Sequence, residues 1–149
     1  MNIYFICTGN TCRSPMAEAI LTSMELENVE VRSAGIYALE GGEMSENAKS
    51  VLEAEQIMID HRSKMVSKDD LQWADLILTM TSAHKALVLQ SYPEVQAKTF
   101  TLKEYTAPYT SKDISDPFGG HYHQYEQTFQ ELNQYITILK NILLSRNGG

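Results

Sequence analysis

Short apolar segments typical of buried strands alternate along this chain with segments of helical periodicity. The strand candidates are residues 2–7, 29–35, 75–80 and 98–105, and the helix candidates begin at Ser14, Ser45, Ser67, Ser82 and Tyr125. Strands that alternate with helices favour a parallel sheet with helices on both faces. The sequence therefore predicts an α/β fold, and ligands of such sheets bind at the carboxyl ends of the strands.

The last helix candidate has the clearest pattern. Its apolar residues recur at steps of four and three over about five turns and form one face of the helix. They are Tyr125, Phe129, Leu132, Ile136, Leu139 and Leu143. In the earlier helices, Pro15 suits the first helical position, and Ser45 and Ser67 suit the N-cap, where a hydroxyl accepts a backbone hydrogen bond.

Residues 1–149 are expected to form one domain, because no internal repeat, low-complexity tract or linker divides them. The apolar runs are too short to span a bilayer, and the N-terminal residues lack the features of a signal peptide. With only two cysteines, the chain is expected to be a cytoplasmic protein without membrane association. The net charge of -7 and the lack of a basic cluster argue against nucleic-acid binding, so local groups must hold any anionic substrate.

The segment CTGNTCRSP, residues 7–15, leads from the first strand candidate to the first helix candidate. A helix N-terminus presents unpaired N–H groups, and a loop above it can direct further N–H groups at one anion. Gly9 permits a backbone angle that other residues avoid, and Asn10 tolerates left-handed geometry. Arg13 adds a planar, two-pronged donor that fits phosphate oxygens. The segment is therefore a candidate phosphate-binding loop.

Cys7 lies at the start of this loop. The positive surroundings predict a thiol pKa below its ordinary value of about 8.5, and the Ser14 hydroxyl could donate to the sulfur. A thiolate beside a bound phosphate is a nucleophile for a phosphate ester or a phosphoramide.

Three other interpretations of Cys7 compete with this one: a small buried side chain, a metal ligand, and a disulfide partner of Cys12. The four histidines show no ligand spacing with the cysteines, which argues against a metal site. A reducing compartment disfavours a permanent disulfide. A transient disulfide is compatible with both observations, because Cys12 could trap an oxidised Cys7.

Four segments of the chain fit the pattern of one known family. They are CTGNTCRSPMAE near the N-terminus, SAG at Ser33, ADLILTM at Ala74 and DPFGG near the C-terminus. The chain thereby resembles the low-molecular-weight protein tyrosine phosphatase family over nearly its whole length. The resemblance implies a three-layer sandwich, in which helices flank a four-stranded parallel sheet and the phosphate-binding loop follows strand one. It also implies a single phosphatase domain without metal or organic cofactor, and we expect a monomer that acts on phosphorylated proteins.

The resemblance assigns roles to the candidate site residues. Cys7 is the nucleophile that forms a phosphocysteine intermediate, and Asp116 is the acid that protonates the leaving group and later the base for the hydrolytic water. Asn10, Ser14 and Ser33 brace the loop. The phosphoryl group is held by Thr8, Gly9, Asn10, Thr11, Cys12, Arg13 and Ser14, with the Arg13 guanidinium. An acid fits the chemistry, because an amine or alkoxide needs a proton to leave, and positioned acids accelerate this step roughly 10²–10⁴-fold.

The sequence departs in two places from the tyrosine-specific members of the family, which carry an aliphatic residue where this chain has Thr11 and aromatic residues where it has Phe118-Gly119. GNTCRS and DPFGG together resemble the bacterial protein arginine phosphatases. A phenol ring favours an apolar wall and an aromatic partner, whereas a planar guanidinium favours a hydroxyl and a carboxylate, such as Thr11 and Asp116. A Thr11 hydroxyl satisfied by its own backbone is the plainer interpretation. Phosphoarginine in proteins is the expected substrate, and phosphotyrosine is the alternative.

Three residues outside the motifs also carry expectations. His61 is expected to brace the site, His84 to lie on an exposed face, and Asp75 to anchor the loop network. Two other functions fit the sequence less well. Arsenate reduction on this fold uses cysteines far downstream, and none follows Cys12. A phosphate-binding module would need neither the thiol nor the acid.

Overall fold

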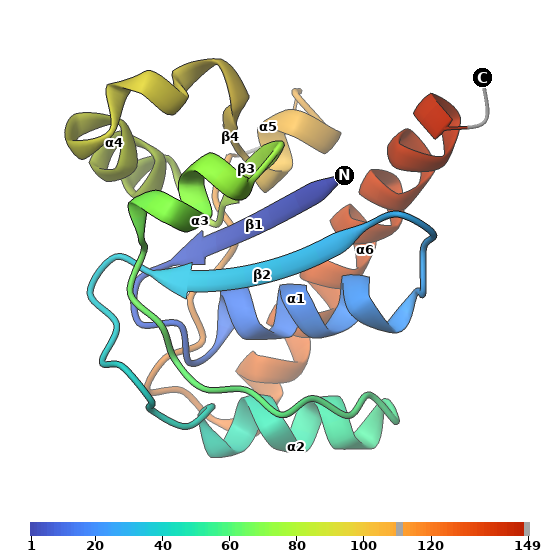
Figure 1. Cartoon of the computed structure of the whole chain (residues 1–149). Helices are drawn as coiled ribbons and strands as arrows, with labels where there is room; N and C mark the ends of the chain where they lie inside the picture. Colours follow the sequence, from blue (N-terminus) through green and yellow to red (C-terminus); the bar gives the residue numbers. More distant parts are fainter. Residues whose placement is uncertain (110–111, 148–149) are drawn as a thin grey trace.

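The described part of the chain, residues 1–109 and 112–147 of the computed structural model, contains one sheet of four parallel strands. The strands are β1 (Asn2–Cys7), β2 (Glu30–Gly35), β3 (Leu76–Thr79) and β4 (Thr99–Thr101). Their order across the sheet is β2-β1-β3-β4, and every neighbouring pair is parallel. The predicted parallel sheet is confirmed, and the carboxyl ends of β1 and β2 meet at one edge (Figure 1).

Helices cover both faces of the sheet. They are α1 (Arg13–Ser23), α2 (Glu46–Ala54), α3 (Lys68–Trp73), α4 (Ser82–Ser91), α5 (Leu102–Thr106) and α6 (Tyr122–Asn147), with a 3₁₀ turn η1 at Pro93–Lys98. α1, α2 and α6 lie on one side of the sheet, and α3 and α4 lie on the other (Figure 1). This arrangement is the three-layer sandwich that the resemblance implied.

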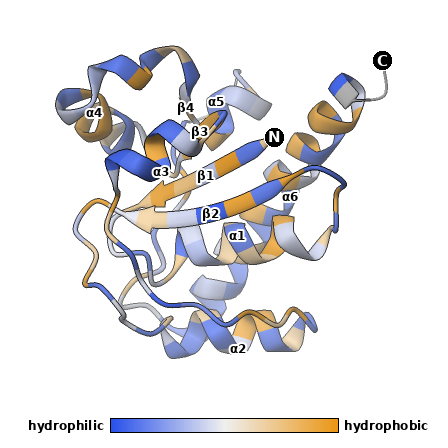
Figure 2. Cartoon of the chain, viewed as in Figure 1, coloured by the Kyte–Doolittle hydropathy of each residue, from blue (hydrophilic) through white to orange (hydrophobic). Residues whose placement is uncertain are grey.

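β1 contributes to two hydrophobic cores, because successive side chains of a strand point to opposite faces. Ile3 and Phe5 pack in the larger core with residues of α1, α2 and α6. Tyr4 and Ile6 pack in the smaller core with residues of α3 and α4. All four side chains are fully buried, and β1 is hydrophobic over most of its length, as expected for a strand covered on both faces (Figure 2).

α6 presents the apolar face that its sequence predicts. All six predicted side chains, from Tyr125 to Leu143, are buried in the larger core. The helix packs against α1, α2 and α5, so it closes one side of the sandwich. No helix in the two described ranges combines the length and the apolar character needed to cross a membrane.

Helix starts agree only in part with the prediction. α1 begins at Arg13, so Pro15 is its third residue rather than its first, where proline is still tolerated because first-turn N–H groups lack a helical acceptor. Ser45 precedes α2, but its hydroxyl lies 3.3 Å from Cys12 Sγ and makes no cap hydrogen bond. Ser67 caps α3 through its side chain, as predicted.

The strand predicted over residues 98–105 is shorter than expected. Only Thr99–Thr101 pairs with β3, and the chain then enters α5. The Thr101 hydroxyl accepts from Glu104 N–H, and the Glu104 carboxylate accepts from Thr101 N–H. This reciprocal capping box starts a helix and outweighs the strand propensity of the segment.

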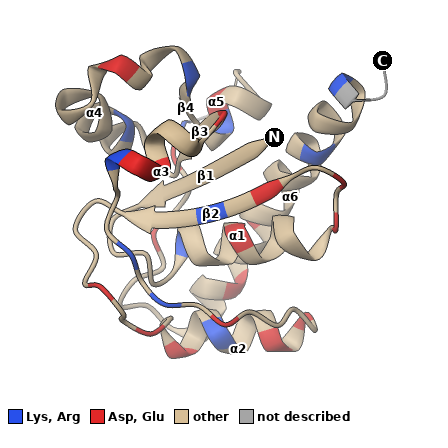
Figure 3. Ribbon diagram, in the orientation of Figure 1, with Lys and Arg blue, Asp and Glu red and all other residues tan. Residues whose placement is uncertain are grey.

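The net charge of -7 is spread over many elements. Acidic and basic residues are interspersed along the ribbon rather than separated into two halves (Figure 3). An anionic substrate would therefore depend on a few groups gathered at the carboxyl edge of the sheet.

Candidate active site

The loop between β1 and α1, residues 8–12, lies directly on the end of β2. A backbone hydrogen bond of 2.9 Å from Tyr37 N–H to Thr8 O holds it there. A Cβ added at Gly35 would lie 2.5 Å from Thr8 O and 2.8 Å from Asn10 N, closer than real atoms approach. The loop can therefore occupy this place only because β2 ends in glycine.

Asn10 is at the centre of the loop's hydrogen bonds. It is fully buried, and its φ of 56° lies in the left-handed region that asparagine tolerates. Its Nδ2 donates to Ser14 Oγ at 2.8 Å and to Ser33 Oγ at 3.0 Å, and its Oδ1 accepts from Lys64 N–H at 3.0 Å. Gly9 does not use the left-handed angle that glycine permits, because the turn falls on Asn10, whose side-chain hydrogen bonds offset the strain.

Other side chains hold the loop from below. His61 Nε2 donates to Asn10 O at 2.8 Å, and Ser63 Oγ donates to the same oxygen at 3.0 Å. Ser33 Oγ donates to Glu18 Oε1 at 2.6 Å, and burial raises the pKa of the Glu18 carboxyl. The His61 contact agrees with the bracing that we expected, whereas Ser63 and Glu18 were not foreseen.

Cys7 ends β1, and its thiol lies beneath the loop, 3% exposed. Ser14 Oγ lies 2.8 Å from Sγ, and Asn10 N–H donates to Sγ at 3.3 Å. Asn10 N–H is a fixed donor to the sulfur and favours the thiolate, and the Ser14 hydroxyl favours it as the donor to a deprotonated sulfur. The structure thus joins Cys7 to Ser14 and Asn10, two of the three residues that were expected to brace the loop.

Burial is nevertheless the largest influence on Cys7, and it raises the pKa of the thiol above its ordinary value. The hydrogen bonds from Ser14 and Asn10 and the charge of Arg13 lower the pKa by less than burial raises it. The predicted lowering of the pKa is therefore wrong in direction. The sequence argument counted the positive groups around the sulfur but not the loss of water.

Arg13 connects the loop to the segment that carries Asp116. Its Nη1 donates to Ile114 O at 3.0 Å, and its Nη2 lies 3.4 Å from Asp116 Oδ2. The Arg13 side chain is only 6% exposed, whereas the Asp116 side chain is 55% exposed. Asp116 Oδ1 also accepts from Phe118 N–H at 3.0 Å. The guanidinium of Arg13, at the start of α1, and the carboxylate of Asp116, about a hundred residues later, therefore lie side by side.

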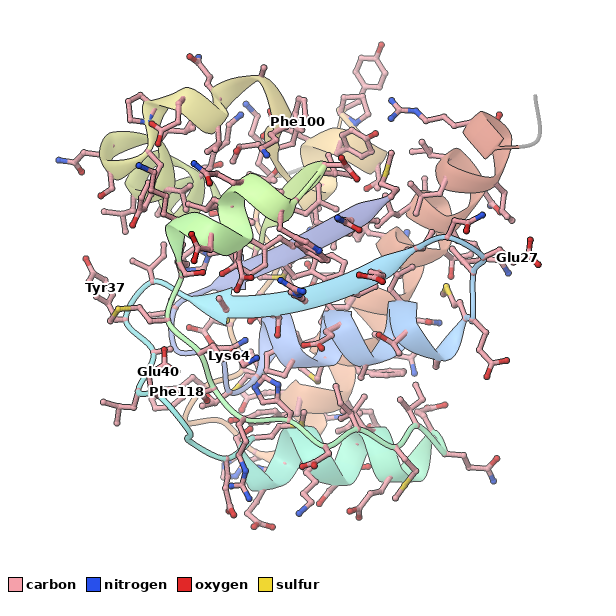
Figure 4. All side chains as sticks on the ribbon, viewed as in Figure 1. Glu27, Tyr37, Glu40, Lys64, Phe100 and Phe118 are labelled. Atoms are coloured by element: carbon pink, nitrogen blue, oxygen red, sulfur yellow. The ribbon has the colours of Figure 1, made fainter. Side chains whose placement is uncertain are left out.

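A pocket of about 220 Å³ lies over the loop. It is lined by Cys7, Thr8, Gly9, Thr11, Cys12, Arg13, Asp116 and Phe118. Asn10, Ser14 and Ser33 do not line it and instead lie behind the loop through the hydrogen bonds described above. Phe118 is 76% exposed and lies on the same side of the molecule as Tyr37 and Glu40 (Figure 4). The pocket places a thiol, a guanidinium and a carboxyl around one space, as nucleophilic attack on phosphorus requires.

Cys12 is a free, buried cysteine, as is Cys7. Its sulfur lies 3.3 Å from Ser45 Oγ, 3.6 Å from Thr11 Oγ1 and 3.7 Å from the Tyr125 hydroxyl. These neighbours are weak partners of a thiol and are not metal ligands, and residues 1–109 and 112–147 hold no group of three side chains suited to a metal.

Two residues lie where the sequence did not place them. His84, expected on an exposed face, is buried at the start of α4 with Nε2 2.8 Å from Thr8 Oγ1. Burial first, and then the charge of Arg13, lowers its pKa to about 4, so the ring is neutral at neutral pH. Its place after β3, at the carboxyl edge of the sheet, was the available signal. Asp75 accepts from Asn2 N–H at 2.8 Å, at the opposite end of β1, so the expectation that it anchors the loop is wrong.

Comparison with known proteins identifies relatives of the chain. The model of the family described as low molecular weight phosphotyrosine protein phosphatase matches residues 2–146. A protein-arginine-phosphatase from Geobacillus stearothermophilus is 48% identical over 134 residues, which cover 90% of each chain. The solved structure of the YwlE arginine phosphatase from that organism gives a TM-score of 0.95 at 46% identity, over 97% of this chain and 94% of the other.

A second similar solved structure has a replaced active-site cysteine. It is a cysteine-to-serine mutant of a YwlE arginine phosphatase with a phosphorylated active-site serine, and it gives a TM-score of 0.92 at 40% identity, over 96% of this chain and 95% of the other. The family match covers the loop over β2, the pocket and the Asp116 segment alike. The chain therefore belongs to the low molecular weight phosphotyrosine protein phosphatase family.

Proposed function

We propose that this protein is a protein arginine phosphatase, which hydrolyses phosphoarginine in proteins through a phosphocysteine intermediate. One observation carries the proposal: Cys7, Arg13 and Asp116 line a single pocket at the point where β1 passes into α1. Such a pocket suits a cysteine-dependent phosphatase, and the relatives named as arginine phosphatases support the choice of substrate.

In the first step, Cys7 gives up its thiol proton to solvent, and the resulting thiolate attacks phosphorus while the bond from phosphorus to the guanidino nitrogen breaks. The electron pair of that bond stays on nitrogen, which takes a proton from Asp116. In the structure Asp116 Oδ1 accepts from Phe118 N–H, and Oδ2 lies 3.4 Å from Arg13 Nη2. Arg13 and the N–H groups at the start of α1 stabilise the charge on the phosphoryl oxygens.

In the second step, water attacks the phosphorus of phosphocysteine, and the Asp116 carboxylate accepts a proton from that water. The bond between sulfur and phosphorus breaks, and its electron pair returns to Cys7 as the thiolate. The Ser14 hydroxyl, 2.8 Å from Sγ, stabilises this leaving sulfur. Inorganic phosphate departs, and the enzyme is ready for the next substrate.

Thr11 and Asp116 are the residues that we propose to select a guanidinium. Within the described residues, the Thr11 hydroxyl has one polar contact, with Cys12 Sγ at 3.6 Å. That long contact to a weak partner leaves the hydroxyl available to a substrate, rather than satisfied by its own backbone. Asp116 adds a carboxylate that fits the planar cation.

Phosphotyrosine is the second candidate substrate, and Phe118 is the observation that favours it. This ring lines the pocket and is largely exposed, so it could stack on a phenol. The family description also refers to phosphotyrosine.

The test is turnover of two peptides of identical sequence that carry phosphoarginine or phosphotyrosine at the same position, with Cys7→Ser as the inactive control. We expect a higher kcat/KM for phosphoarginine. Thr11→Val, which keeps the shape and removes the hydroxyl, is expected to lower that value about tenfold and to spare phosphotyrosine. Equal or greater turnover of phosphotyrosine by the unaltered enzyme contradicts the arginine assignment, and no turnover of either peptide contradicts the phosphatase itself.

We further propose that the enzyme acts as a cytoplasmic monomer on phosphorylated proteins. Cys7, Arg13 and Asp116 all belong to this chain, so the proposed chemistry needs no residue from a second copy. Both cysteines are free, which fits a reducing compartment. Sedimentation of the purified protein tests the first statement.

A further inference from the structure

Asp116 has few contacts of its own. Its side chain is about half exposed, and its two polar contacts in the described residues are Arg13 at 3.4 Å and Phe118 N–H at 3.0 Å. The first of these is long for a hydrogen bond, and the second lies within the same turn. The position of the carboxyl group therefore depends on how the backbone around residue 116 is held.

One side of that backbone is attached to the sheet and the loop. Ile114 is buried, its N–H donates to Met80 O at 2.9 Å, and its carbonyl accepts from Arg13 Nη1 at 3.0 Å. These bonds fix the segment two residues before Asp116. They do not fix the rotation of the chain between residue 114 and Pro117.

Ser115 is held from the opposite direction, by α6. Its N–H donates to Glu131 Oε1 at 3.3 Å, and its hydroxyl donates to Glu131 Oε2 at 2.9 Å. A carboxylate only accepts, so the Ser115 hydroxyl proton points to Glu131, and Thr128, 3.1 Å from Ser115 Oγ, is the donor to that oxygen. Backbone and side chain of one residue are thus bound by one carboxylate, which restricts both displacement and rotation.

Glu131 is itself held in place by a buried cation. Lys103 Nζ of α5 lies 2.9 Å from Glu131 Oε1, and the two side chains are 11% and 22% exposed. A charged pair with so little water around it has a defined geometry. A series of contacts thus leads from Lys103 in α5 through Glu131 to Ser115, the residue directly before Asp116.

We infer that Glu131 is a positioning residue for the general acid: it fixes Ser115 and so aims the Asp116 carboxyl at the leaving group. This inference rests on the acid role proposed for Asp116. The alternative is that the Lys103–Glu131 pair only fastens α5 to α6. Both roles predict a less stable protein when Glu131 is removed, so stability alone does not separate them.

Two substrates with different leaving groups distinguish the two roles of Glu131. Nitrophenyl phosphate releases a phenolate that departs readily without a proton, whereas phenyl phosphate releases a more basic phenolate that needs one. A misaimed acid therefore slows phenyl phosphate more than nitrophenyl phosphate. A general loosening of the fold slows both by the same factor.

The experiment measures kcat/KM for both esters in the full-length enzyme and in Glu131→Ala, each with and without Asp116→Asn. We expect Glu131→Ala to lower turnover of phenyl phosphate roughly 10- to 100-fold and of nitrophenyl phosphate about threefold or less, since small misplacements of a catalytic group have effects of this size. In the Asp116→Asn background, Glu131→Ala should have no further selective effect, because the acid that it aims is gone.

Three further variants keep the test decisive. Ser115→Ala removes one of the two bonds to Glu131 without leaving a charge unpaired, so it reports even if Glu131→Ala does not fold, and a smaller loss of the same selectivity is expected. Lys103→Met breaks the ion pair between α5 and α6 but leaves the Ser115 bonds. It should therefore lower the free energy of unfolding while changing the ratio of kcat/KM for the two esters little. Glu126→Ala, on an exposed part of α6, should change neither.

The two assignments fail in different ways. If Asp116→Asn itself slows both esters equally, the acid role of Asp116 is wrong. If Asp116→Asn is selective but Glu131→Ala and Ser115→Ala slow both esters equally, or add to Asp116→Asn in full, the positioning role of Glu131 is overturned.

Discussion

Replacement of Gly35 by alanine should damage catalysis more than it damages the fold. The new Cβ would lie 2.5 Å from Thr8 O, 2.8 Å from Asn10 N and 2.9 Å from Gly9 C, all of them backbone atoms. Restoring an ordinary separation of 3.4 Å requires the loop to move about 0.9 Å. Displacement of a catalytic loop by about 1 Å costs on the order of 10²-fold in rate, whereas overpacking of this size costs about 1–3 kcal/mol of stability.

The measurement is kcat/KM on the phosphoarginine peptide alongside urea unfolding of the same variant. Glu126→Ala is the control, because the Glu126 side chain is half exposed on α6 and does not line the pocket. We expect a loss of 10- to 100-fold for Gly35→Ala and less than about twofold for the control. A Gly35→Ala enzyme with near-normal kcat/KM would refute the argument that the loop position is set by contact with the end of β2.

Two further predictions concern titration and oxidation. The folded protein keeps His84 neutral down to a pKa of about 4, whereas the unfolded chain takes up the proton near 6.5, so stability is full above 6.5 and is lost as pH falls toward 4. Between about pH 7 and pH 5, the unfolding free energy of His84→Gln should therefore fall by roughly 1–2 kcal/mol less than that of the native enzyme. An equal fall in both proteins would contradict a neutral, buried His84. After mild peroxide, the Cys7 sulfenic acid should condense with the Cys12 thiol and release water, so a thiol reductant restores the activity of the native enzyme. Cys12→Ser should lose activity irreversibly under the same treatment, and equal recovery of both enzymes would exclude the disulfide.

The layers of the fold were predictable because they depend on local patterns. β1 is an apolar run flanked by polar residues, and α6 repeats its apolar side chains at helical steps, so each pattern identifies its element without reference to the rest of the chain. The segment after β3 was harder, because the strand propensity of residues 99–101 and the capping box at Thr101 compete within a few residues. Only the pairing with β3 determines how much of the segment becomes strand.

The candidate site was predictable where its residues are neighbours in sequence. Cys7, Arg13 and Ser14 flank one short loop, residues 8–12, so their types and spacing indicate the chemistry. The residues that were missed act across large separations: Gly35 through the space that it leaves, His84 through Thr8, and Glu131 through Ser115. None of these three has a distinctive local context, because each contact exists only once the sheet has brought its partner alongside.

The wrong direction for the Cys7 pKa shows why the loop geometry matters to catalysis. A positive loop and a buried sulfur oppose each other, and here burial dominates. The thiolate therefore depends on the donors beside the sulfur, two of which are the Ser14 hydroxyl at 2.8 Å and Asn10 N–H at 3.3 Å. Asn10 also holds Ser14 through its Nδ2, so a single buried asparagine orients both donors. The reactivity of Cys7 therefore depends on the left-handed turn at Asn10. Gly35 leaves the space that this turn occupies, so Gly35 also supports the nucleophile.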